Sequence, residues 1–133
     1  MKLEFLDDLS CGGKYPDVIT DQLIRLFDYT TDEVKAFSET ITNELIKNKK
    51  SIEVDKLIFV QPINCTLKFE LNQDDIGIVK NNSTDFSCQL TIKSFKDMIS
   101  LLEPFTNDES SGYQWLCDSK TGIDLLFSQG GGW

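Results

Sequence analysis

The sequence predicts a single α+β domain over residues 1–133, with two layers: a mainly antiparallel sheet and two helices on one of its faces. Three observations lead to this class. Apolar residues recur with helical spacing in two segments, they alternate with polar residues in several shorter segments, and turn-forming residues separate these shorter segments. A chain of 133 residues, 40% of them hydrophobic, is also long and apolar enough to bury one core.

The first helix is the clearest element. Residues 3–9 predict an edge strand, and residues 22–29, which are rich in branched and aromatic side chains, predict a second strand that leads into a helix over 31–47. Thr30 and Glu33 have the spacing of a capping box at its start. Its core-facing side is expected to carry Val34, Phe37, Ile41 and Leu45. The opposite side is expected to carry Asp32, Glu39 and Asn43.

After the helix, the hydrophobic pattern changes to a period of two. Strands are expected at 51–61, 65–71, 76–80 and 85–92, and short polar turns between them indicate an antiparallel meander with one apolar and one polar face. A second helix is predicted to be capped by Ser94, with Asp97 three residues later, and to end at Glu103-Pro104, on the same side of the sheet as the first helix. A hairpin of residues 113–117 and 123–127 completes the predicted fold.

Charge limits the possible partners. Thirteen basic and 22 acidic residues give a net charge of −9, and Arg25 is the only arginine. Nucleic acid is excluded as a partner, because phosphate binding depends on clustered Lys and Arg. The negative charge is interpreted either as a means of staying soluble or as attraction to a basic protein partner.

The cysteines indicate a reducing cytoplasm. Cys11, Cys65, Cys88 and Cys117 form no CxxC pair, and the chain has no histidine, so neither a metal site nor a cofactor is expected. The first eight residues lack the apolar region of a signal peptide. No apolar run approaches the roughly 18 residues that suggest a membrane span, so no membrane association is predicted.

No catalytic residue is predicted. Without histidine, a GxSxG elbow, a P-loop or a GxGxxG motif, the common catalytic arrangements are missing. The adjacent pairs Asp7-Asp8 and Asp74-Asp75 are interpreted as solvated surface charges. Cys88 is expected to be buried as a small apolar residue. Cys11-Gly12-Gly13 favours a turn over an anion-binding loop.

The aromatic residues near the C-terminus allow two interpretations. Tyr113, Trp115 and Cys117 are expected to share one face of their strand, where they complete the core against the returning strand or serve as binding anchors. Core packing is the favoured role for Trp115. Trp133, which follows three glycines, fits either role equally well.

Three groups of residues carry a resemblance to known proteins. They are Leu23–Tyr29 running into Asp32–Val34, Phe86–Leu90 running into Leu101–Phe105, and Gly112–Leu116 with Ile123–Ser128 and Gly132-Trp133. Together they resemble a family of small uncharacterised bacterial cytosolic proteins. In size, charge and architecture the chain also resembles, more loosely, the acidic α+β immunity proteins that neutralise bacterial toxins. The resemblance implies no catalytic residue.

The sequence therefore favours a non-catalytic acidic module that binds a protein, and an immunity protein or an inhibitor is the form that the resemblance implies. The expected binding residues are Asp32, Glu39, Asn43 and Trp133. The second hypothesis is a small carboxylate-based enzyme or ligand-binding protein. The third is a homo-oligomeric structural subunit. The sequence does not distinguish oligomeric states.

Overall fold

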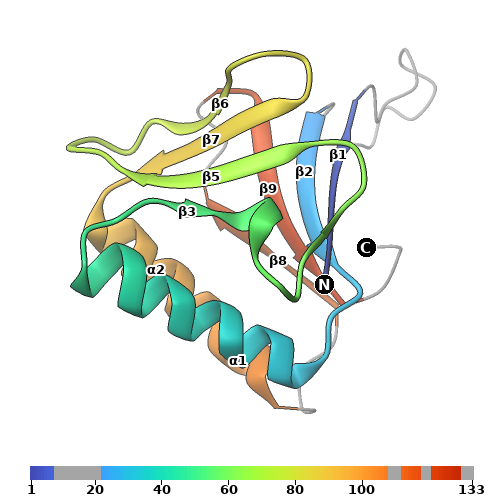
Figure 1. Cartoon of the computed structure of the whole chain (residues 1–133), viewed down its shortest axis with the longest axis vertical. Coiled ribbons are helices and arrows are strands. Elements are labelled where there is room, and N and C mark those ends of the chain that lie inside the picture. The colour runs from blue at the N-terminus through green and yellow to red at the C-terminus, as the bar shows by residue number, and fades with distance from the viewer. Residues whose placement is uncertain (8–21, 108–111, 118–120, 130–133) are drawn as a thin grey trace.

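The computed structural model describes residues 1–7, 22–107, 112–117 and 121–129, and in these residues short strands pack against two helices that lie together (Figure 1). The segments η1 and η3 continue the two helices as a π-helix and a 3-10 helix, and η2 is a single 3-10 turn. The elements in chain order are β1 (Lys2–Leu6), β2 (Gln22–Phe27), α1 (Thr31–Thr40), η1 (Ile41–Lys47), β3 (Ile52–Glu53), η2 (Val54–Lys56), β4 (Gln61–Pro62), β5 (Thr66–Leu71), β6 (Gly77–Lys80), β7 (Asp85–Leu90), α2 (Ile92–Leu102), η3 (Glu103–Thr106), β8 (Tyr113–Cys117) and β9 (Ile123–Ser128).

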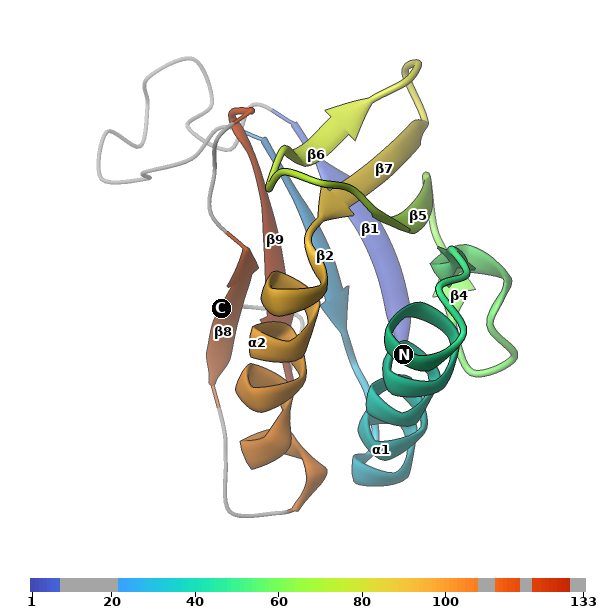
Figure 2. The same cartoon turned by 90° about the vertical axis from the view of Figure 1, so that its left-hand side faces the viewer.

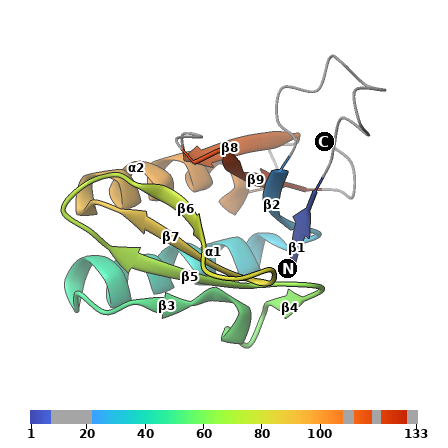
Figure 3. The same cartoon turned by 90° about the horizontal axis from the view of Figure 1, so that it is seen from above.

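The strands divide between two sheets whose strands run in clearly different directions (Figures 1 and 3). The five-stranded sheet has the order β4-β1-β2-β9-β8, and its centre is the parallel pair β2 and β9. The predicted edge position of the first strand is wrong, because β4 pairs with β1 on its outer side at Lys2 and Leu3. Residues 8 and 9 of that predicted strand lie outside the described residues.

The four-stranded sheet has the order β3-β5-β7-β6, so the predicted antiparallel meander is wrong. Strand β7 lies parallel to β5, and β6 is displaced to the outside of β7. Burial explains the order. The strands with the most buried apolar residues, β5 and β7, take central positions, while β6 has only four residues and ends in exposed Lys80, as suits an edge strand.

The predicted strand over 51–61 is also wrong. Only Ile52–Glu53 and Gln61–Pro62 are extended, and the chain turns between them through η2. The turn is held by hydrogen bonds from the Leu57 amide to the Val54 carbonyl (3.2 Å) and from the Val60 amide to the Leu57 carbonyl (2.9 Å). The alternating apolar pattern of this segment therefore reflects a compact turn, which buries Val54 and Val60, and not a strand.

The first helix is confirmed over its full predicted length, as α1 followed by η1. The capping box is present: the Glu33 amide donates to Thr30 Oγ1 (3.2 Å), and the Thr30 amide donates to Glu33 Oε1 (2.9 Å). The four predicted core-facing side chains are fully buried. The predicted cap of the second helix at Ser94 is wrong: the helix begins at Ile92, and Thr91 is its cap and accepts a hydrogen bond from the Ser94 amide (3.2 Å).

One hydrophobic cluster joins both sheets and both helices. Phe69 of β5 lies at its centre, with ring-centroid distances of 5.9 Å to Phe37 of α1 and 5.5 Å to Phe95 of α2. The two helices lie side by side (Figure 2), as predicted, and α2 makes extensive contact with η1. The α+β class predicted from the sequence is confirmed.

Candidate functional site

The solvent-facing side of α1 and η1 carries the residues that the sequence predicted for binding. Asp32, Glu39 and Asn43 are all exposed, on the side of the helix opposite its buried residues. Among the residues that the structure describes, these three side chains have no hydrogen-bond or ion-pair partner, and neither does exposed Lys35 between them. We call Asp32, Glu39 and Asn43 the helix face.

A loop is fastened to the same helix through the first residue of the chain. The Met1 ammonium group donates to Glu33 Oε2 (2.8 Å) and to the carbonyl of Phe59 (3.1 Å). Partial burial acts to raise the pKa of Glu33, but the hydrogen bonds and charge supplied by the ammonium and Thr30 outweigh it, and this pKa is lowered. The Phe59 ring also lies edge-on to Phe37, at 6.5 Å. The loop at 57–60 therefore has a fixed position beside α1.

This loop exposes apolar side chains that the sequence analysis missed. Ile58 is 100% exposed, and Ile63, just beyond β4, is 49% exposed. The backbone beside Ile63 is held firmly, because the Asn64 side chain exchanges two hydrogen bonds of 2.8 Å with the amide and carbonyl of Phe5. The sequence predicts a strand over 51–61 that includes Ile58, and this prediction gives no indication that the Ile58 side chain is exposed.

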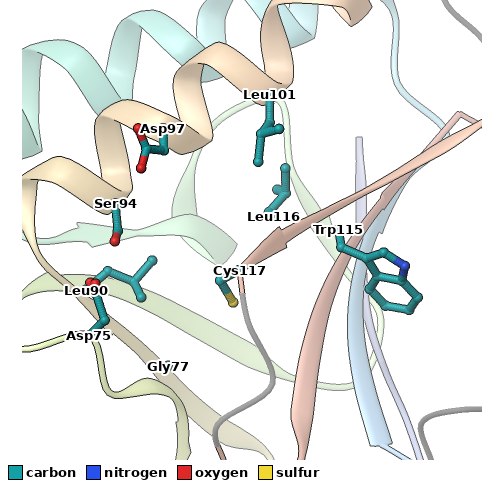
Figure 4. Close-up of a pocket in the computed structure, with 9 residues that line it drawn as sticks. All are labelled: Asp75, Gly77, Leu90, Ser94, Asp97, Leu101, Trp115, Leu116 and Cys117. Carbon is teal, nitrogen blue, oxygen red and sulfur yellow. The ribbon is translucent and has the colours of Figure 1, made fainter.

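A hollow of about 220 Å³ lies between α2, β8 and the start of β6 (Figure 4). Its apolar lining includes Leu90, Leu101 and Leu116. Its polar lining comprises Asp75, Ser94, Asp97 and Cys117. This volume is below the range of about 300–1,000 Å³ that is typical of small-molecule sites. The hollow is therefore a small recess in the surface.

Both carboxylates at the hollow are engaged in contacts within the protein. Asp75 Oδ1 accepts hydrogen bonds from the Thr91 amide (2.9 Å) and the Thr91 hydroxyl (3.0 Å). Asp97 Oδ2 accepts from Lys93 Nζ (3.1 Å), one helical turn earlier. The interpretation of Asp74-Asp75 as solvated charges holds for exposed Asp74 and is wrong for Asp75, which is half-buried and ties α2 to the sheet.

The aromatic residues of β8 differ from their predicted arrangement. The register shifts between Trp115, which pairs with Leu126, and Cys117, which pairs with Leu125. Leu116 is thus the extra residue of a β-bulge, and the expectation that Trp115 and Cys117 share a face is wrong. Cys117 packs against the main core, whereas the Trp115 ring is directed away from the hollow (Figure 4).

Trp115 therefore does not complete the core against residues 123, 125 and 127, which was its favoured role. It is half-buried opposite Leu126, on the other face of the sheet. Tyr113, whose ring contacts Trp115 at 6.2 Å, is 53% exposed. Trp133 lies outside the described residues, so its predicted role stays a prediction.

Cys65, Cys88 and Cys117 are free thiols, and Cys11 lies outside the described residues. Cys88 is fully buried, as predicted. Its pKa is raised well above the usual value, first by a hydrogen bond with the Cys117 thiol and then by burial. Burial, together with the nearby charges of Asp55 and Glu4, raises the pKa of Cys65 to about 12. In the described part of the chain, no group of three or more Cys, Asp or Glu side chains could hold a metal ion.

Comparisons with protein-family models, with curated proteins and with solved structures gave no match. The resemblances noted from the sequence thus remain predictions. Within the described ranges, no helix has the length and apolar character needed to cross a membrane.

Proposed function

We propose that this protein is a non-catalytic acidic module that binds a basic protein partner through the helix face. The observation that carries the proposal is the presence of outward carboxylates on α1, at Asp32 and Glu39, that form no hydrogen bond or ion pair with other described residues. Charged groups already engaged within a protein must break those contacts to meet a partner. These two are available without that cost.

The loop fastened to α1 supplies the apolar contact that such an interface needs. Charges at an interface mainly raise the association rate and specificity, whereas buried apolar anchors supply much of the affinity. Ile58 is fully exposed on a loop that is bonded to α1 through the Met1 ammonium, so charge and apolar surface are presented by one rigid unit. Ile58 is accordingly the proposed anchor.

The polar face of the four-stranded sheet is a weaker candidate surface. Glu70 is bonded to both of its polar neighbours there: Lys68 Nζ lies 3.6 Å from Glu70 Oε1, and Gln89 donates to Glu70 Oε2 (3.2 Å). A partner would have to replace these contacts. This is the reason for preferring the helix face.

The net charge of −9 favours a partner of opposite sign, and Arg25, the only arginine, is paired with Glu4 (2.7 Å). The specific form that we propose is an immunity protein or inhibitor of a bacterial toxin or enzyme, acting in a reducing cytoplasm. In that setting, rapid electrostatically guided association is the property that the helix face would provide.

The test is to capture the partner from native cells at low salt and to measure association with the double variant Asp32→Lys/Glu39→Lys. We expect slower association and a weaker dependence of its rate on salt, with unchanged thermal stability because both side chains are exposed. Asp74→Lys/Glu103→Lys is the matched control. It makes the same change in net charge at exposed sites outside the helix face, on the turn before β6 and on η3, and should affect association much less.

Ile58→Ser provides an independent measurement at the same surface. It should increase the dissociation rate while leaving the salt dependence of association unchanged, since it removes an apolar contact and no charge. Equal effects of the two charge variants would show that only net charge matters, and the helix face would be rejected. Absence of any captured protein would reject the binding function itself.

A further inference from the structure

Two cysteines from different sheets have their sulfur atoms in contact. Cys88 lies in β7 of the four-stranded sheet, and Cys117 lies at the end of β8 in the five-stranded sheet. Their thiols share a hydrogen bond. This contact joins the two sheets at one point beside α2.

The β-bulge in β8 creates this contact. With regular pairing, Cys117 would share a face with Trp115 and would be directed away from the core. The extra residue Leu116 reverses this direction, so that Cys117 lies on the same side of the sheet as Leu125. Bulges commonly serve to redirect a side chain in this way.

The two thiols differ in accessibility. Cys117 is half-buried and lines the hollow (Figure 4). Cys88 has no exposed surface. A reagent that enters the hollow can therefore meet Cys117 but not Cys88.

We propose that Cys88 and Cys117 are a dithiol modification site that reacts with small disulfides, such as oxidised glutathione, and closes to an intramolecular disulfide. Cys117 reacts first because it is the thiol open to the hollow. Cys88 then resolves the product because its sulfur is already in contact with that of Cys117. The inference is independent of the proposed protein-binding function.

The two steps balance as ordinary thiol–disulfide exchange. Cys117 loses its proton and its sulfur attacks one sulfur of the small disulfide, which breaks the disulfide bond and releases one small thiol. Cys88 then loses its proton and attacks the Cys117 sulfur, which releases the second small thiol. Two protein thiols are oxidised to one disulfide, and one small disulfide is reduced to two thiols.

The raised pKa of Cys88 agrees with this order, because attack requires a thiolate and Cys88 holds its proton firmly. Contact with Cys117 compensates by holding the two sulfurs together once the mixed disulfide forms. Cys65 is the natural control within the chain. It is 5% exposed and has a pKa of about 12, and no sulfur contact is recorded for it within the described residues.

The experiment uses the full chain with Cys11→Ser, so that Cys65, Cys88 and Cys117 are its three thiols. The fully reduced protein is incubated with oxidised glutathione, quenched with an alkylating agent and analysed by intact mass and peptide mapping. We expect the loss of two hydrogen atoms, a peptide that links Cys88 to Cys117, and complete alkylation of Cys65.

Three variants test the order of the steps. Adding Cys88→Ser should leave one glutathione attached at Cys117, adding Cys117→Ser should abolish both products, and adding Cys65→Ser should change nothing. Circular dichroism checks that each variant is folded. The mass and peptide map of the Cys11→Ser protein alone also test the proposal. Full alkylation of Cys88 and Cys117 after oxidation would overturn it. An equal yield of disulfides that include Cys65 would overturn it as well.

Discussion

The backbone amides at the start of the two helices find their hydrogen-bond partners in different ways. Both begin after a threonine whose hydroxyl accepts a hydrogen bond from an amide three residues later, at Glu33 in α1 and at Ser94 in α2. In α1, Glu33 of the same turn accepts from the Thr30 amide (2.9 Å). In α2, the corresponding Thr91 amide donates to Asp75, which lies before β6 and β7 in the chain (2.9 Å).

The difference shows how a cap can either stay local or become part of the tertiary structure. The cap of α1 requires only residues of its own first turn, so it stabilises the helix wherever the helix lies. In α2 the bond between Thr91 and Ser94 is local, but the Thr91 amide gains its partner Asp75 only when the loop before β6 is in place. This second bond therefore couples the start of the helix to the four-stranded sheet, and four predictions follow from this comparison.

The largest expected change in stability comes from the cores of the two helices, and it tests whether the helices differ only at their caps. Phe37 of α1 and Phe95 of α2 both pack on Phe69 and are both fully buried. Phe37→Ala and Phe95→Ala should each lower the free energy of unfolding by about 2–5 kcal/mol. Chemical denaturation measures this loss. Glu39→Ala should stay within about 0.5 kcal/mol, and an equal loss there would contradict the orientation of α1.

The next effect concerns the cap that depends on tertiary structure. Asp75→Ala removes the acceptor of two hydrogen bonds from half-buried Thr91 and leaves its amide without this partner. We expect a loss of about 1–3 kcal/mol in the free energy of unfolding. Asp74→Ala is the matched control, because the neighbouring Asp74 side chain is exposed. Indistinguishable losses at the two positions would refute the role of Asp75.

A double-mutant cycle sharpens the contrast. Thr30→Ala and Thr91→Ala should each cost about 1 kcal/mol, which is typical of an N-cap. Combined with Asp75→Ala, Thr91→Ala should be clearly less than additive because the two residues share hydrogen bonds, whereas Thr30→Ala should be additive. The same denaturation experiment supplies all the required values. Additivity in both cycles would mean that the two caps are equally local.

The smallest effect concerns pH and Glu33, which caps α1 and also accepts a hydrogen bond from the Met1 ammonium. Since the pKa of Glu33 is lower in the folded protein, its contribution is complete above its usual value of 4.5 and is lost as the pH falls through the folded value. Glu33→Gln should therefore lower stability by up to about 1 kcal/mol near neutral pH, and the difference should disappear in acid. Denaturation at several pH values measures it. Glu39→Gln is the control, because the Glu39 side chain is exposed and forms no hydrogen bond or ion pair with another described residue; an equal loss there would contradict the role of Glu33.

The same distinction explains how much of the structure was predictable from the sequence. The helix over 31–47 was predicted to its ends because its capping box and apolar spacing are both local. The sequence places the cap of α2 three residues late, at Ser94 instead of Thr91, because Asp75, the partner of the Thr91 amide, belongs to another segment. The insertion of β7 beside β5 depends on which strands bury most, and this is decided by packing between distant segments.

The candidate sites divide in the same way. The exposure of Asp32, Glu39 and Asn43 follows from helical spacing, so the sequence predicted it. The exposure of Ile58 and the contact between Cys88 and Cys117 depend on a turn and a β-bulge that have no evident signal in the sequence. A one-residue bulge at Leu116 is enough to invert the expected direction of Cys117.

The pairing of β2 with β9 also affects how the chain must fold as it is synthesised. Gln22 pairs with Ile123, so the centre of the five-stranded sheet brings together segments from near the two ends of the chain. Such long-range pairings slow folding, and during translation β2 emerges long before its partner. Until β9 leaves the ribosome, one edge of β2 stays unpaired, and that is the interval in which a nascent chain is most open to aggregation or to chaperone binding.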